Sequence, residues 1–416
     1  MPPPPSWPEM LHVFGRIGLL SFGGPAAQIG VMHRELVDER PWLSEQQFLN
    51  ALGFCMLLPG PEAMQLATYA GWRLRGTAGG LLAGLLFVLP GALVIAVLTL
   101  LYARYGTLPQ TESLLLGIKA TVIVIVYEAL RRLMRKGLTG PAMSWVAGLS
   151  FAAIFLFQIP FPLLILAAAA FGATRASPAP VQQTLPTGTF RPGVILLWAT
   201  LWLLPLPLLA LSGQTLLFDL SAFFAKLAVV TFGGAYAVLA YMAQEVVTAR
   251  GWLDPLQMVD ALGLAETTPG PLILVTQFVG MLTGYTAGGT GLALAAGALT
   301  LWMTFVPCFL WIFAGAPYVE HLQTRPRLQS ALGAITAAVV GVILNLSVWF
   351  ALHVVFNTVT QVNFGPLSLP IPDPASLRSD ALILTALAAL LLLVLHRGPL
   401  ITLPLMALAG WALSLL

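Results

Sequence analysis

Long apolar runs recur along almost the whole chain, and they limit its fold more than any other feature. A helix that crosses a lipid bilayer needs about 20 consecutive apolar residues. Hydrophobic residues make up 58% of the 416 positions and charged residues only 8%, whereas soluble domains carry roughly 25% charged residues. Because so few charges cannot cover a water-facing surface, the sequence predicts an all-α polytopic membrane protein. It argues against a soluble enzyme, a secreted module and a nucleic-acid-binding protein.

The apolar runs predict about thirteen membrane spans. We take a span to be an apolar run between charged residues or breaks rich in Pro and Gly. The predicted spans cover residues 11–32, 45–72, 78–101, 113–130, 142–157, 159–173, 193–211, 217–242, 256–285, 290–313, 328–356, 380–396 and 398–416. A polar, Pro-rich linker is expected at 174–192 and a long loop at 357–379.

Lysine and arginine in short loops indicate orientation, because loops rich in them stay on the cytoplasmic side. Three groups stand out, at 73–75, 131–136 and 325–327. Placing all three inside agrees with thirteen spans, and only Arg104 dissents. We therefore expect a cytoplasmic N-terminus and a C-terminus on the opposite side of the membrane.

A pattern of irregular motifs occurs twice, 210 residues apart. Phe22-Gly23-Gly24 recurs as Phe232-Gly233-Gly234, and Pro59-Gly60-Pro61 recurs as Pro269-Gly270-Pro271. Single residues recur in the same register, namely Glu35, Arg40, Trp42 and Leu43 as Glu245, Arg250, Trp252 and Leu253. The sequence therefore predicts a tandem duplication of a six-span unit.

The duplication divides the chain into an N-terminal repeat at 1–173, a linker with one extra span at 174–216, and a C-terminal repeat at 217–416. Six spans would leave both repeats facing the same way, and the extra span inverts the second. Inverted repeats are typical of secondary transporters, whose binding site lies near the bilayer midplane. The alternative is a duplicated scaffold without a role in transport.

The Phe-Gly-Gly and Pro-Gly-Pro motifs lie inside apolar runs and are expected to break the helices there. Proline removes a backbone donor, and glycine tolerates the sharp backbone that a break requires. A broken helix presents free N–H groups and the positive end of its dipole, which together bind anions. We predict an anion cradle from the backbone of Gly23, Gly24, Gly60, Gly233, Gly234 and Gly270. The alternative is that the motifs are kinks for packing.

One cation lies six residues before each Phe-Gly-Gly motif, Arg16 in the first repeat and Lys226 in the second. A cation inside an apolar span is costly unless a partner compensates it. We predict that both attract a multivalent anion and that alanine at either position abolishes transport. The alternatives are snorkelling to the interface or an internal salt bridge. Lys119, inside another span, is a further candidate without a counterpart in the second repeat.

Two carboxylates and several polar side chains flank the Pro-Gly-Pro motifs. Glu62 and Glu266 are candidate proton carriers, with capping of a half-helix as the alternative. Four side chains can donate hydrogen bonds to the oxygens of an anion, or hold helices together instead. They are Gln65, Thr267, Thr268 and Gln277.

Cysteine and histidine indicate neither a metal site nor a bound cofactor. Cys55 and Cys308 lie in apolar runs, which fits neither a disulfide framework nor a zinc site. The five histidines are scattered without the spacing of metal ligands. We expect no metal and no cofactor.

The motifs together resemble the chromate ion transporter family in its long, two-repeat form. They read FGGP at 22–25, RPWL at 40–43, LPGPEAMQLA at 58–67, FGGAYAVL at 232–239, GWLD at 251–254 and TTPGPLILVTQFVG at 267–280. The resemblance implies a multi-pass protein of the bacterial inner membrane that exports chromate from the cytoplasm and confers chromate resistance. It also implies sulfate, a similar tetrahedral dianion, as a competitor. Our topology then places the C-terminus in the periplasm.

The resulting hypothesis is outward transport of chromate by alternating access between the repeats, driven by the membrane potential and with protons as a second source. A transporter of sulfate or molybdate with the same architecture is the first alternative. An intramembrane enzyme is the second, but the chain has no Gly-x-Ser-x-Gly or His-Glu-x-x-His motif. The repeats differ at Pro25, matched by Ala235, and at Glu62, matched by Leu272, so a strictly symmetric site is not expected.

Overall fold

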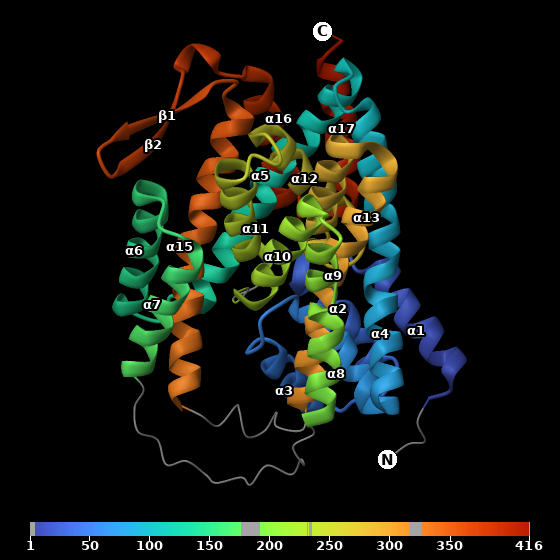
Figure 1. Cartoon of the computed structure of the whole chain (residues 1–416). Helices are drawn as coiled ribbons and strands as arrows, with labels where there is room; N and C mark the ends of the chain where they lie inside the picture. The colour runs from blue at the N-terminus through green and yellow to red at the C-terminus, as the bar shows by residue number, and fades with distance from the viewer. Residues whose placement is uncertain (1–4, 176–191, 231, 233–234, 317–325, 416) are drawn as a thin grey trace. The chain divides into compact units, whose positions relative to one another are not determined.

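The structure is a computed structural model that describes residues 5–175, 192–230, 232, 235–316 and 326–415 (Figure 1). The chain divides into two compact units, and each draws on both predicted repeats. Unit 1 comprises Met1–Leu100, Pro178–Ala235 and Thr268–Pro326. Unit 2 comprises Leu101–Ser177, Tyr236–Thr267 and Arg327–Leu416.

Unit 1 is built from α-helices with short π-helical and 3₁₀ turns. Its elements are α1 (Trp7–Leu20), α2 (Gly24–His33), η1 (Arg34–Asp38), α3 (Glu45–Cys55), most of α4 (Glu62–Tyr105), α8 (Pro192–Leu203), α9 (Pro205–Leu211), α10 (Thr215–Val230), η3 (Leu272–Leu274) and α13 (Val275–Gly315). The predicted extra span corresponds to α8 and α9. Two indole N–H groups join α8 to α13: Trp202 donates to the carbonyl of Met303, and Trp302 donates to that of Leu201.

Unit 2 is organised around α5 (Pro109–Gly137), which packs against α12 (Pro255–Thr267), α16 (Ser379–Ala389) and α17 (Pro399–Leu413). Its other elements are α6 (Pro141–Phe157), α7 (Phe161–Thr174), α11 (Ala235–Ala243), η2 (Gln244–Ala249), α15 (Pro326–Val355), β1 (Val359–Phe364), β2 (Leu367–Pro372), η5 (Pro374–Ser376) and η6 (Leu390–Val394). Glycines let the helices approach closely, because a methyl group on Gly117 would collide with the backbone of Met406.

The helices agree in position with the predicted spans. Within the described residues, five helical segments are long and apolar enough to cross a membrane. They are Glu62–Tyr105, Pro109–Gly137, Pro192–Leu211, Leu272–Gly315 and Pro326–Val355. The other apolar helices are shorter, in part because the predicted breaks interrupt them.

Both segments of 44 residues are hairpins of two antiparallel helices, as the paired spans predict. The first turns at Gly76, where φ is 62°, and the second at Gly289, where φ is 75°. A methyl group on Gly80 would lie 3.0 Å from the carbonyl oxygen of Thr68, although twelve residues of straight helix span about 18 Å. Each Pro-Gly-Pro motif thus leads into a short helix, after which the chain reverses into a longer helix.

The first Phe-Gly-Gly motif also interrupts a helix and reverses the chain. Helix α1 ends at Leu20 and α2 begins at Gly24, with positive φ at Gly23 and Gly24. Arg16 and Glu35 form an ion pair of 3.3 Å across this break, whereas a straight helix would separate them by about 28 Å. The second motif falls between α10 and α11, and Gly233 and Gly234 lie outside the described residues.

The local structure repeats at the same 210-residue offset as the sequence. Reciprocal caps open α3 through Ser44 and Gln47 and open α12 through Asp254 and Gln257. The π-helical turns η1 and η2 occupy matched positions. Each is followed by a tryptophan whose N–H donates to a carbonyl in the turn, Trp42 to Leu36 and Trp252 to Val246. These matched details support a duplicated folding unit.

The expected loop at 357–379 is wrong in one respect, because it contains a β-hairpin. Strands β1 and β2 pair antiparallel, with Phe364 opposite Leu367 and a turn in which Gly365 has φ 61°. The β-branched residues of the Val-Thr-Gln-Val run favour an extended strand. The all-α class otherwise holds throughout the described residues. Most of the linker, at 176–191, lies outside them, and the boundaries of the sequence repeats stay a prediction.

Candidate functional site

The broken helices of both repeats meet inside unit 1. The backbone N–H of Gly270 donates to the carbonyl of Ser21, and its carbonyl accepts from Nε2 of Gln28, both at 2.8 Å. Ser21 and Gln28 flank the first Phe-Gly-Gly motif. The Gly270 amide therefore already has a partner in this conformation. The Gly270 N–H is therefore not free for an anion in this conformation, and its role in anion binding stays a prediction.

Each Pro-Gly-Pro motif packs on the second helix of the hairpin that belongs to the other repeat. A methyl group on Gly60 would lie 3.1 Å from Sγ of Cys308, in the second half of α13. A methyl group on Gly270 would lie 3.2 Å from the carbonyl oxygen of Phe87, in the second half of α4. Gly60 and Gly270 also have positive φ, of 115° and 84°. Only glycine satisfies both the backbone angle and the close approach.

The two predicted hydrogen-bond donors, Gln65 and Gln277, both bond to backbone carbonyls, Gln65 within its own repeat and Gln277 in the other. Nε2 of Gln65 donates to the carbonyl of Pro59 at 2.7 Å, and Nε2 of Gln277 donates to that of Ala92 at 3.0 Å. Their Oε1 atoms are buried without a hydrogen-bond partner among the described residues. The amide N–H groups of both side chains are thus engaged by backbone carbonyls, and the groups without a partner are acceptors. An anion could use these amides only after they leave the carbonyls.

The two threonines before the second Pro-Gly-Pro motif differ. Oγ1 of Thr267 donates to the carbonyl of Leu264, which closes the last turn of α12. Thr268 is buried. Thr267 is therefore engaged by its own helix, and Thr268 is the one enclosed at the break.

The predicted cations have different surroundings. Arg16 pairs with the fully buried carboxylate of Glu35, which Arg40 also contacts at 2.7 Å. The Arg16 side chain is still 43% exposed. Lys226 is exposed on α10. The structure therefore shows an internal ion pair at Arg16, and a role in attracting an anion stays a prediction at both positions.

The predicted proton carriers also differ. Glu62 opens α4 and is half-buried, where a carboxylate favours the helix N-terminus. Glu266 is buried in the last turn of α12 and accepts a hydrogen bond of 2.9 Å from the hydroxyl of Tyr236. Because Glu266 lies at the C-terminal end of its helix, N-terminal capping does not explain it.

A buried ion pair in unit 2 escaped the sequence analysis. Nζ of Lys119 lies 3.0 Å from Oδ1 of Asp260, and their side chains are only 9% and 7% exposed. The hydroxyl of Tyr102 donates to Oδ2 of Asp260 at 2.8 Å. The signal for Asp260 was present, since it is an acid inside the predicted span 256–285.

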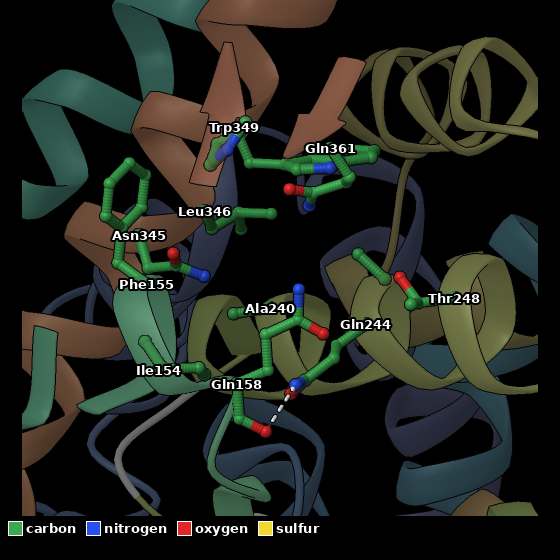
Figure 2. Close-up of a pocket in the computed structure, with 12 residues that line it drawn as sticks. Ile154, Phe155, Gln158, Ala240, Gln244, Thr248, Asn345, Leu346, Trp349 and Gln361 are labelled. Carbon is green, nitrogen blue, oxygen red and sulfur yellow. Dashed lines mark hydrogen bonds between the residues drawn. The ribbon is translucent and has the colours of Figure 1, made fainter. Parts of the chain in front are cut away.

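Unit 2 also contains a polar cavity of about 70 Å³ (Figure 2). Gln158 and Gln244 lie in the lower part of the view, and Asn345 and Gln361 lie in the upper part. Nε2 of Gln244 donates to the carbonyl of Gln158 at 3.3 Å, and its Oε1 has no hydrogen-bond partner in the described chain. Amides donate and accept without net charge, so the cavity suits water or a small oxyanion.

The described residues offer little to a metal ion. No group of three His, Cys, Asp or Glu side chains within them comes together as ligands. Cys55 and Cys308 are free, buried thiols.

The fold defines a multi-pass helical membrane protein with paired helix breaks, and its sequence relatives give the family. The family model for chromate transporters matches residues 8–173 and 218–411. The chain therefore belongs to the chromate transporter family. Membership makes it a transporter and not an enzyme, which confirms the resemblance of its motifs.

Individual relatives match at similar identity. A chromate transport protein of Cupriavidus metallidurans is 32% identical over 341 residues, covering 80% of each chain. A chromate transport protein of Pseudomonas aeruginosa is 33% identical, covering 82% of this chain and 80% of its own. The uncharacterized transporter YwrA of Bacillus subtilis is 32% identical over 159 residues, which are 88% of its length but 37% of this chain. A unit of about one repeat thus exists as a separate protein. No solved structure matches this chain.

Proposed function

We propose that this protein carries chromate out of the bacterial cytoplasm, across the inner membrane, and so confers chromate resistance. The main support for this proposal is that relatives named chromate transport proteins match across both repeats at 32% and 33% identity. Sulfate is the expected competitor, because both ions are tetrahedral dianions.

Alternating access between two inverted repeats is the proposed mechanism. The repeated caps and π-helical turns support one folding unit used twice. The reciprocal packing of the Pro-Gly-Pro motifs in unit 1 is what a twofold relation produces, because each copy then makes the same contact to the other. Because α8 and α9 add one span between the repeats, the second repeat would cross the membrane in the opposite direction to the first.

The membrane potential is a sufficient driving force for export. With the cell interior negative, each exported negative charge gains about 2.3 kcal/mol per 100 mV. A dianion that leaves alone gains twice that free energy, so no nucleotide is required. Protons entering through Glu62 or Glu266 would add to it.

The helix breaks are the proposed place of substrate binding in unit 1. The backbone of Gly23, Gly24 and Gly60 can present N–H groups, and Gly270 joins them if the break opens and releases Ser21. Gln65 and Gln277 would then turn their amide N–H groups from backbone carbonyls to the anion. The hydrogen bonds that Gly270 makes at the break avoid the cost of unpaired backbone in a bilayer.

Flux through the purified protein tests the proposal. We expect sealed vesicles with the protein to take up chromate when the interior is made positive, and sulfate to inhibit this uptake. The chromate inside should be chemically unchanged. Uptake equal to that of empty vesicles would contradict the proposal, and faster uptake of sulfate or molybdate would favour the alternative substrates.

A further inference from the structure

The pair of Lys119 and Asp260 is costly for a helix bundle and needs an explanation. Lys119 lies ten residues after Pro109, about 15 Å along the 29-residue helix α5. A charged side chain at such a depth costs several kcal/mol unless it is paired. An apolar pair of similar volume is often as stable as a buried ion pair or more so. Packing alone therefore gives little reason for these residue types.

The repeat comparison removes a second explanation, inheritance from the duplicated unit. Asp260 corresponds to Asn50 at the 210-residue offset, and Asn50 is half-buried and accepts a hydrogen bond from Gln46. The buried acid therefore belongs to the second repeat alone. Lys119 also has no matching cation in the second repeat.

We propose that Lys119 binds the transported oxyanion and that Asp260 is the counter-ion which the oxyanion displaces. This inference rests on the proposed function and adds to the helix breaks of unit 1 a second place of contact with the oxyanion, in unit 2. A tetrahedral dianion offers Lys119 more negative charge than one carboxylate. The Tyr102 hydroxyl, already bonded to Oδ2 of Asp260, holds the carboxylate after Lys119 turns to the substrate.

This exchange lets a buried cation exist in both states of the transporter. Without substrate, Asp260 neutralises Lys119 at 3.0 Å. With substrate, the oxyanion takes that place, and the returning carboxylate competes with it and promotes release. Asp260 thus weakens binding and speeds turnover, an effect that a purely structural partner would not have.

Initial rates of chromate uptake into vesicles test the exchange. Lys119→Met should lower uptake by at least about thirtyfold, because it removes the cation that pairs with the buried charge of the oxyanion. Asp260→Asn should lower KM by about tenfold and lower kcat, because the competing carboxylate is gone. Arg132→Met is the matched control, since Arg132 is an exposed cation on the same helix that pairs with Glu128. It should transport like the wild type.

The double variant Lys119→Met/Asp260→Asn separates binding from folding. It leaves no unpaired charge, so we expect a folded protein by gel filtration and thermal unfolding, and no uptake. Wild-type uptake by this variant, or a higher KM for Asp260→Asn, would overturn the inference. If wild-type vesicles move sulfate and not chromate, the proposed substrate fails. The same pattern of variants measured with sulfate would then still support the exchange, and any other pattern would overturn it.

Discussion

Helices α3 and α12 are copies of one element that differ in their buried chemistry. Both begin with a reciprocal side-chain cap and lead into a Pro-Gly-Pro break. In α12, Asp260 and Glu266 are buried carboxylates with defined partners. The matched residues in the first repeat are Asn50 in α3 and Met56 directly after it, and Met56 is 49% exposed. The duplication thus kept the backbone and changed the charges.

The two repeats therefore do not share one set of buried carboxylates. Backbone features such as caps, breaks and turns depend on local geometry, so both copies retain them. Ionisable groups inside a membrane are retained only where they are used. We therefore expect the breaks of both repeats to contribute equally to stability. We expect the carboxylates of α12 to contribute to transport without counterparts in α3.

Among variants that test the asymmetry between the repeats, Glu266→Gln should have the largest effect on transport. The amide still accepts a hydrogen bond from Tyr236 but cannot carry a proton. We expect the stimulation of chromate uptake by an imposed proton gradient to fall by roughly tenfold, a typical size for coupling between two sites. Glu62→Gln, at the half-buried start of α4, should keep most of it. Equal loss in both variants would contradict the asymmetry.

Glu35→Gln and Glu245→Gln compare one ion pair in its two copies. Glu35 is fully buried between Arg16 and Arg40, whereas Glu245 is 22% exposed and lies 3.8 Å from Arg250. Removing one member of a buried pair costs about 3 kcal/mol, and the partly exposed Glu245 pair should cost less, nearer the value of about 1 kcal/mol for surface pairs. Thermal unfolding in detergent should show the larger loss for Glu35→Gln. The reverse order would be inconsistent with the observed burial.

Gly60→Ala and Gly270→Ala should destabilise the protein to the same degree. Each alanine would adopt positive φ and also press on the other repeat, at a cost of about 2 kcal/mol for the backbone alone. Gly30→Ala is the control, since nothing lies within 4 Å of the added methyl group. It should be neutral or slightly stabilising. A loss confined to one of the two break glycines would show that the breaks are not equivalent.

A smaller pH effect on stability should come from His33, whose contacts have no counterpart in the second repeat. The hydrogen bond to Glu45 is the largest cause that raises the pKa of His33, and the bond to Asp38 adds to it. Because the folded state raises this pKa, the stabilisation is complete below the unfolded pKa of about 6.5 and is lost as pH rises through the folded pKa. The second repeat has Ala243 and Pro255 at the matched positions.

His33→Asn should remove this part of the pH dependence of thermal unfolding. The wild-type midpoint should fall across that pH window, and the variant midpoint should change less. Identical pH profiles for the two proteins would show that the His33 contacts do not contribute to stability.

The sequence predicted the helices and breaks well because both depend on local pattern. The turns at Gly76 and Gly289 fall between the predicted spans. The pairing of Lys119 with Asp260 was out of reach, because no local pattern couples residues so far apart in the chain. The hydrogen bond from Gly270 to Ser21 was missed for the same reason. The β-hairpin was missed because the polar residues at 357–379 favoured a loop and its β-branched run is short.

If the repeats have opposite orientations, the hairpin turns at Gly76 and Gly289 lie on opposite sides of the membrane. Ala78 and Ala287 are exposed beside these turns, while the natural Cys55 and Cys308 are buried. A maleimide that cannot cross membranes should, in intact cells, label Ala287→Cys and leave Ala78→Cys unlabelled until the cells are opened. Labelling of both cysteines from the same side would contradict inverted repeats and the alternating-access mechanism built on them.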